Sequence, residues 1–298
     1  MRVPERFTEM KITRKAYAKI NLGLDVIGKR DDGYHIVKMI MQNVDIYDTL
    51  SFEDTQDPGV VLSSHDESVP TDDSNLICKV AHQLKEKYDV AKGVRIELEK
   101  RIPVAAGMAG GSTDAAAAYL ALNELWGLGL SGEELCGLAV KLGADIPYCI
   151  VGGTALSEGI GEVLTPFENN ADYRLVVAKP DISVSTGWVY TELDSHEIAD
   201  HPDIDGVKRA IEEGDVHGMC RLIGNVLEPV TVSRYPVITD IERLLEENGA
   251  VRAFMTGSGP TVFAVYDDEV KAAEGFEAVK ESGLARQFFL TGPIDPRQ

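Results

Sequence analysis

The stretch that decides the fold of this chain is Ile102-Pro-Val-Ala-Ala-Gly-Met-Ala-Gly-Gly-Ser-Thr-Asp-Ala-Ala-Ala-Ala118. It follows a strand-like run over 94–99 and leads into an alanine-rich helix that we expect over 112–126. A helix start exposes unpaired N–H groups and the positive end of the helix dipole, so it attracts phosphate. Glycine tolerates positive φ and lets the backbone approach an anion closely. The stretch predicts a phosphate-binding loop, with an ordinary strand-to-helix turn as the alternative.

The predicted loop is rich in small residues and ends in two hydroxyls. Ser112 and Thr113 are placed to cap the helix or to contact a phosphate or its metal. No lysine precedes Ser112, so the loop is not of the Walker type. The residues expected to bind the nucleotide phosphates are Pro103, Val104, Ala105, Ala106, Gly107, Met108, Ala109, Gly110, Gly111, Ser112 and Thr113.

A second glycine pattern, Gly127-Leu-Gly-Leu-Ser-Gly132, matches the spacing of a dinucleotide-binding motif. It lies between two helical patterns, whereas a dinucleotide motif follows a strand. We interpret it as a connection between helices.

Composition and charge exclude several classes of protein. The chain has 298 residues, of which 44% are hydrophobic and 26% charged, which is typical of a globular protein of two domains or one large one. The net charge of −20 argues against a nucleic-acid partner. No apolar run of 18 residues or leader-like start is present, so we expect a cytoplasmic protein without a membrane partner. The four cysteines and six histidines are scattered, which predicts neither a disulfide framework nor a protein metal site.

The order of elements predicts an α+β chain of two domains. We expect a turn-prone boundary near 168–172, and hence domains over 1–168 and 169–298. Ser131 to Glu134 reads as a capping box that opens a helix reaching about residue 142. The other strands are expected over 11–17, 20–28, 36–47, 48–53, 59–62, 174–178, 251–255, 261–266 and 287–290, with short strands between 153 and 164; the other helices are expected over 74–88 (capped by Asp73 or Ser74), 206–213, 216–222, 235–248 and 269–282.

Three further blocks could carry chemistry. In Ala18-Lys-Ile-Asn-Leu22, the period of a strand places Lys19 and Asn21 on one face, where they could address a phosphate and a hydroxyl. Asp145 lies just past a predicted helix, between Gly143 and Pro147, on a constrained turn where a carboxylate could accept a proton. Thr256-Gly-Ser-Gly-Pro260 is a tight turn between two strands. Each block has a simpler alternative. Lys19 and Asn21 could be solvated residues of a strand edge, Asp145 could bond to its own backbone, and the turn over 256–260 could be a plain hairpin.

A fourth block, Gly33-Tyr-His35, follows a charged turn. Tyr34 and His35 could place an aromatic ring and an imidazole at the mouth of a pocket. Simple packing is the alternative.

Taken in order, these blocks resemble the GHMP kinases (galacto-, homoserine, mevalonate and phosphomevalonate kinases). The resemblance covers residues 18 to 260, nearly the whole chain, and includes Glu158-Gly-Ile-Gly-Glu162. The blocks Asp32-Gly-Tyr-His35 and Gly143-Ala-Asp-Ile-Pro147 resemble the branch of the family that acts on a cytidine diphosphate-linked polyol. Alanine stands at 105, 106 and 109, where the family loop often has glycine.

The resemblance implies a fold and a reaction. The fold would combine an N-terminal domain like the second domain of ribosomal protein S5 with a ferredoxin-like C-terminal domain, and the active site would lie between them. The protein would transfer the γ-phosphoryl group of ATP, with Mg²⁺, to a hydroxyl of the polyol, as a monomer or weak homodimer. Another GHMP small-molecule kinase, a lyase of the same fold and a non-catalytic nucleotide-binding regulator are the alternatives.

The resemblance also implies roles for single residues. Asp145 would accept the hydroxyl proton, and Lys19 would hold that carboxylate ionised and stabilise charge on the reacting oxygens. Asn21 would orient the hydroxyl. Tyr34, His35 and an aromatic residue of the second domain would recognise cytosine, with Tyr190 preferred over Trp188.

Overall fold

The computed structural model describes residues 10–297, which form two compact units. The first unit takes its residues from 10–16, 47–101 and 111–150, and the second from 17–46, 102–110 and 151–297. Two long strands, β1 (Lys11–Lys29) and β2 (His35–Thr55), run through both units. The units therefore do not follow the contiguous division at 168/169, and that boundary stays a prediction.

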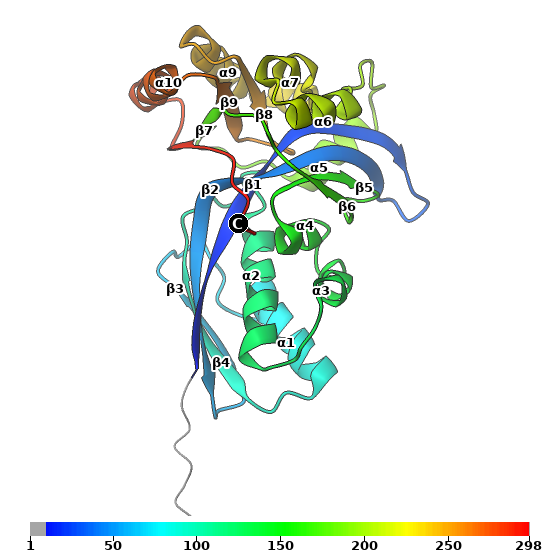
Figure 1. Ribbon diagram of the computed structural model, residues 1–298, viewed down its shortest axis with the longest axis vertical. Coiled ribbons are helices and arrows are strands. Elements are labelled where there is room, and N and C mark those ends of the chain that lie inside the picture. The colour runs from blue at the N-terminus through cyan, green and yellow to red at the C-terminus, as the bar shows by residue number, and fades with distance from the viewer. Residues whose placement is uncertain (1–9, 298) are drawn as a thin grey trace, which may run out of the picture. The chain divides into compact units, whose positions relative to one another are not determined.

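The first unit is a small sheet covered by helices (Figure 1). Residues 49–55 of β2 pair antiparallel with β4, and β3 pairs parallel with β4. Besides β2, its elements are β3 (Val60–Ser64), α1 (Leu76–Tyr88), β4 (Gly93–Glu99), α2 (Gly110–Leu125), α3 (Gly132–Ala139) and α4 (Ile146–Val151).

The core of the first unit explains why α2 is so rich in alanine. Ala115, Ala116 and Ala118 are buried, as are the larger Tyr119 and Leu122. Small side chains let the helix backbone approach its neighbours closely, so α2 is surrounded by packed atoms on several sides. The helix is therefore central to this unit.

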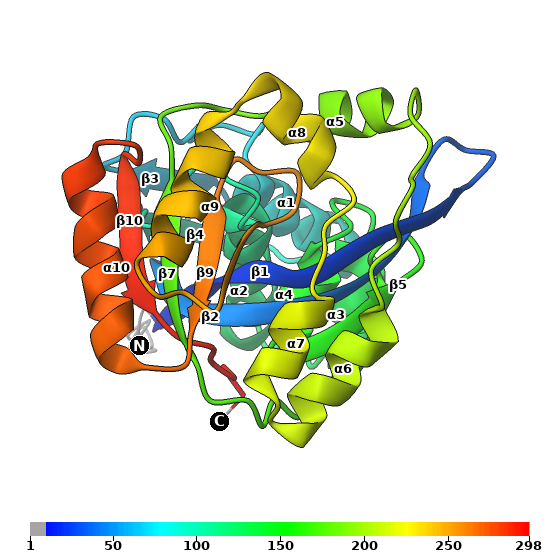
Figure 2. The same cartoon turned by 90° about the horizontal axis from the view of Figure 1, so that it is seen from above.

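The second unit contains a four-stranded antiparallel sheet in the order β10-β7-β9-β8. Helices α9 and α10 pack against this sheet (Figure 2). Residues 39–42 of β2 pair with β5, which pairs with β6. The elements are β5 (Thr154–Glu158), β6 (Val163–Phe167), β7 (Arg174–Lys179), α5 (Thr186–Leu193), α6 (Ile204–Glu213), α7 (Val216–Leu222), α8 (Glu228–Arg234), α9 (Val237–Glu247), β8 (Arg252–Met255), β9 (Val262–Tyr266), α10 (Glu269–Ser282) and β10 (Gln287–Thr291).

The predicted α+β class is confirmed, and most predicted elements lie within a few residues of their expected places. The capping box is confirmed, because Ser131 accepts a hydrogen bond from the backbone N–H of Glu134 and Glu134 bonds back to Ser131. The strand breaks predicted near residues 18 and 48 are wrong, because β1 and β2 are each one continuous strand across these positions.

Some helix details also differ from the prediction. Asp73 or Ser74 as the cap of α1 is wrong: Asn75 caps it, with its side chain accepting a hydrogen bond from the backbone N–H of Ile77 at 2.9 Å. Helices α4, α5 and α8 were not predicted. Among residues 10–297, no helix is long and apolar enough to span a bilayer.

Candidate functional site

Lys19 and Asn21 lie together on β1, as the period of the strand predicts. Lys19 Nζ donates to Asn21 Oδ1 at 2.8 Å, and the two residues are only 5% and 4% exposed. The backbone N–H of Asn21 donates to Thr256 Oγ1 at 2.9 Å, and its side-chain amide contacts Met39 Sδ at 3.2 Å. A solvated strand edge is thereby excluded, and the pair is a fixed, buried polar group.

The central part of the predicted phosphate loop packs against the turn over 256–260. The backbone N–H of Lys19 donates to the carbonyl of Met108 at 3.2 Å. Gly107 has φ +73°, and a Cβ there would lie 2.6 Å from the carbonyl oxygen of Thr256. Only glycine fits this close approach of two backbones. The structure therefore joins two blocks that the sequence separates by some 150 residues.

The turn over 256–260 is itself held firmly. The Asn225 side-chain amide donates to the carbonyls of Met255 and Gly257 at 2.9 and 2.8 Å. The hydroxyls of Thr186 and Ser258 hydrogen-bond at 2.8 Å. Asn225 was not singled out by sequence analysis, because its partners lie about 30 residues away.

The loop backbone is strained at two alanines. Ala105 and Ala109 have φ of +52° and +57°, in the left-handed region that favours glycine. Ala106 is not among the residues with positive φ, and its side chain is buried. The chain thus keeps a glycine-like backbone path at two of the three alanines of this loop.

The start of α2 differs from the prediction. The helix begins at Gly110, so Ser112 is its third residue and is not its cap. Ser112 is half-buried, and Thr113 is buried. The prediction placed the helix start by its hydroxyls, whereas the left-handed backbone of Ala109 ends the loop earlier.

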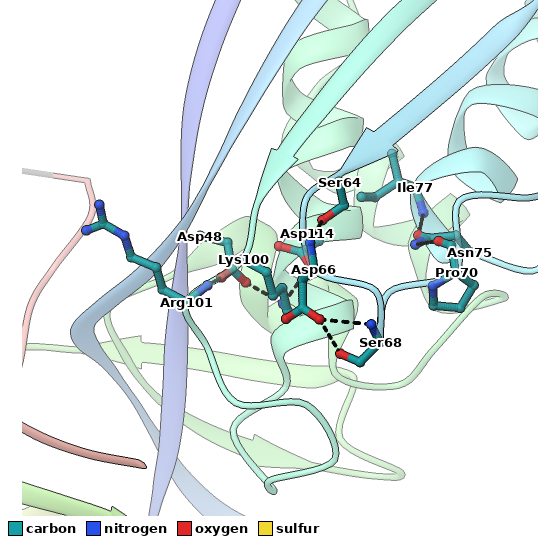
Figure 3. A network of polar contacts seen from close by, with 10 residues as sticks. All are labelled: Asp48, Ser64, Asp66, Ser68, Pro70, Asn75, Ile77, Lys100, Arg101 and Asp114. Carbon is teal, nitrogen blue, oxygen red and sulfur yellow. Dashed lines mark hydrogen bonds and ion pairs between the residues drawn. The ribbon is translucent and has the colours of Figure 1, made fainter. Parts of the chain in front are cut away.

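A buried ion cluster connects the residues on either side of this loop in the chain (Figure 3). Lys100 Nζ lies 2.8 Å from Asp114 Oδ2 and also pairs with Asp48. Asp48 Oδ1 accepts the backbone N–H of Arg101 at 2.5 Å. Burial raises the pKa of Asp114 to about 8 despite the nearby Lys100. The cluster ties residues 100 and 101, which precede the loop, to the second turn of α2, which follows it.

Asp145 lies on a turn, as predicted, and immediately precedes α4. The backbone N–H of Ile146 donates to the carbonyl of Gly143 at 3.2 Å, and that of Cys149 to the carbonyl of Asp145 at 3.2 Å. Asp145 is half-buried in the first unit. Its position is thus fixed by local backbone bonds, while its role as a base stays a prediction.

His35 and Tyr190 form the aromatic group that the sequence predicts. Their ring centroids lie 4.8 Å apart at an angle of 33°. Trp188 instead packs edge-on against Tyr235, with the Arg234 guanidinium over its ring. Tyr190, the residue preferred by sequence analysis, is therefore the one beside His35.

Tyr34 lies at the tip of the β1–β2 hairpin, and its ring is open to solvent. Tyr34 is 58% exposed. The tip is closed by a hydrogen bond from the backbone N–H of Arg30 to the carbonyl of Tyr34 at 2.7 Å, and by Gly33 at φ +91°. An exposed ring on a fixed turn, near a stacked histidine, can bind a planar ligand.

The described residues contain no group of three or more histidine, cysteine, aspartate or glutamate side chains arranged to hold a metal.

Comparison with known families finds two matches. A model described as the GHMP kinases N terminal domain matches residues 75–153, and one described as GHMP kinases C terminal matches residues 207–284. Each range lies on one side of the predicted boundary at 168/169.

Comparison with known proteins gives full-length relatives. The chain is 49% identical over 280 residues to 4-diphosphocytidyl-2-C-methyl-D-erythritol kinase of Lachnoclostridium phytofermentans, covering 94% of this chain and 96% of the relative. The kinase of the same name from Alkaliphilus oremlandii is 48% identical over 270 residues, covering 90% and 92%.

Solved structures agree with these relatives. The crystal structure of a 4-(cytidine 5'-diphospho)-2C-methyl-D-erythritol kinase superposes with a TM-score of 0.80 at 30% identity, covering 94% of this chain and 98% of that one. Homoserine kinase from Cytophaga hutchinsonii has a TM-score of 0.79 at 19% identity, covering 98% of each chain, which shows a shared fold.

Proposed function

The chain belongs to the GHMP kinase family, and we propose that it phosphorylates the 2-hydroxyl of 4-diphosphocytidyl-2-C-methyl-D-erythritol with ATP. The products are ADP and the 2-phosphate, in the non-mevalonate route to isoprenoid precursors. The observation that carries this proposal is the similarity to 4-diphosphocytidyl-2-C-methyl-D-erythritol kinases. Three such relatives are 45–49% identical to this chain, and each alignment covers at least 90% of both proteins.

The second unit supports phosphoryl transfer through its buried lysine. Catalysis of this reaction rests on positioning and on neutralising charge, because the transferred group carries several negative oxygens. The backbone N–H of Lys19 binds the loop at the carbonyl of Met108, and its side chain is held by Asn21. The ammonium group of Lys19 supplies a positive charge to the γ-phosphoryl group. Asn21 orients the accepting hydroxyl.

The phosphates of ATP bind along the loop over 103–113. Its backbone N–H groups and the Ser112 and Thr113 hydroxyls are the donors, and Mg²⁺ brought with ATP offsets the remaining negative charge. Asp145 accepts the proton of the 2-hydroxyl, as a fixed carboxylate does in other phosphoryl transferases.

The hairpin tip and α5 recognise the cytidine part. Tyr34 and Tyr190 stack on the base, and His35 hydrogen-bonds to its edge. The close packing of His35 on Tyr190 supports this assignment. A site that pairs polar groups of its substrate rejects compounds that lack them.

The experiment is ADP release with Mg-ATP and four alcohols: the cytidyl compound, its analogue without cytidine, homoserine and mevalonate. Turnover of the cytidyl compound alone is expected. Turnover of another alcohol would keep the kinase reaction and refute the cytidine assignment. ATP binding without turnover of any alcohol would favour a regulator or a lyase.

A further inference from the structure

Asp194 holds His35 on one side and a lysine on the other. Its Oδ1 lies 2.7 Å from His35 Nε2, and its Oδ2 accepts a hydrogen bond from Lys29 Nζ at 2.6 Å. Asp194 is the C-cap residue of α5, one turn after Tyr190, and its backbone N–H donates to the Tyr190 carbonyl at 3.2 Å. The base-binding aromatic and the partner of the histidine thus come from one short helix, beside the hairpin tip (Figure 2).

This contact determines which nitrogen of the imidazole carries the hydrogen. A neutral imidazole has one donor and one acceptor nitrogen, and an ionised carboxylate only accepts. Hydrogen bonds from Lys29 and His35 lower the pKa of Asp194, so its carboxylate is ionised at neutral pH. In the neutral imidazole, Nε2 therefore carries the hydrogen and donates it to Asp194, and Nδ1 presents a lone pair.

We propose that Asp194 is a specificity-determining positioning residue, which fixes this tautomer of His35 and so selects a base with an exocyclic amino group. The inference rests on the proposed function, because it requires that a nucleobase meets His35. The amino group of cytosine donates to the Nδ1 lone pair, whereas uracil presents a carbonyl oxygen at the same position. Two facing acceptors form no hydrogen bond and repel each other.

Lys29 makes the proposal sharply testable through the variant Asp194→Asn. Lysine can only donate, so it binds the amide oxygen of the new asparagine and turns the amide NH₂ toward His35. Nε2 must then accept, and the hydrogen moves to Nδ1. The variant is expected to reverse the tautomer, and Nδ1–H then favours the carbonyl of uracil.

The assay is kcat/KM at pH 8 for the cytidyl substrate and for its uridyl counterpart. The unmodified protein is expected to prefer the cytidyl compound by about 10- to 100-fold, the effect of one unmade hydrogen bond. Asp194→Asn is expected to reverse this preference. Lys29→Met alone keeps it, because the aspartate still only accepts. Combining Lys29→Met with Asp194→Asn frees the amide to turn and brings the two values within about threefold of each other.

A matched control comes from Lys38 and Asp205, another surface pair of the second unit, 2.8 Å apart and without a histidine. Asp205→Asn is expected to leave base preference unchanged. The tautomer itself is read from the ¹⁵N chemical shifts of the His35 ring, which need no turnover.

Two results would overturn the proposal: equal losses for both substrates in Asp194→Asn, or the same His35 tautomer in that variant and the unmodified protein. If the unmodified protein turns over neither compound, the proposed function fails and base selection fails with it. The ¹⁵N shifts then still decide whether Asp194 sets the tautomer.

Discussion

Replacing Ala109 by glycine is expected to stabilise this protein, whereas the same change at Ala106 is expected to destabilise it. Ala109 has φ +57°, a conformation that costs a residue with a Cβ about 1–2 kcal/mol. Glycine removes that cost but adds about 0.5–1 kcal/mol of chain entropy lost on folding. The net gain is therefore roughly 0.5–1 kcal/mol, and Ala105, at φ +52°, should behave alike.

At Ala106 both contributions are unfavourable to the glycine variant. Ala106 is only 3% exposed, so its methyl group is buried. Removing it forfeits about 0.8 kcal/mol of burial and adds the same entropic cost, a loss of about 1–2 kcal/mol. The two variants should thus differ by about 2 kcal/mol in free energy of unfolding.

Urea unfolding of the unmodified protein and of the glycine variants at 105, 106 and 109 measures this difference. The comparison requires that the slope of the free energy of unfolding against urea concentration is the same for all four. The unmodified protein and the Ala106→Gly variant are the references for the two strained positions. If all three glycine variants lose stability by similar amounts, the left-handed backbone at 105 and 109 is refuted.

Three further predictions concern single ionisable residues. Asp145→Asn should keep nucleotide affinity and lower turnover by on the order of 10²-fold or more, measured by ADP release; near-normal turnover would remove Asp145 as the base. Lys19→Ala should lower kcat strongly while the melting temperature changes little. A large loss of stability with little loss of kcat would instead indicate a structural role. Burial and the neighbouring Glu228 and Glu246 raise the pKa of Glu242 to about 8. The folded state therefore binds a proton that the unfolded state releases, and stability falls as pH rises from about 4.5 to about 8. Glu242→Gln should raise the free energy of unfolding at pH 8 by up to about 4 kcal/mol, with a much smaller gain at pH 5; equal gains at both values would contradict the assignment.

The sequence predicted those features whose cause is local. The pairing of Lys19 with Asn21 follows from strand period, and the capping box at Ser131 follows from spacing within one helical turn. The turn at Asp145 follows from its flanking glycine and proline. Each of these needs only neighbours in the chain, so residue order was enough to find them.

The helices that were missed are short and lack a strong apolar period. Helix α5 has eight residues and α8 has seven, and α8 has no side-chain cap. Isolated helices of this length are not stable, and packing against the rest of the unit determines whether they form. Helix α8 contacts α5, which lies far before it in the chain, as well as α9, which follows it directly.

The missed polar residues have partners that are far away in the chain. Asp194 is 159 residues from His35, and Asp48 is 52 residues from Lys100. Asp114 lies in the predicted helix directly after the loop, and its carboxyl group is buried against Lys100. A buried carboxyl group needs a hydrogen-bonding or charged partner, so an aspartate among alanines in a buried helix indicates that a polar partner exists. Residue order alone does not say which residue that partner is. The antiparallel register of β2 and β4, pairing Thr49 with Glu99, brings Asp48 to Lys100 and so supplies the answer.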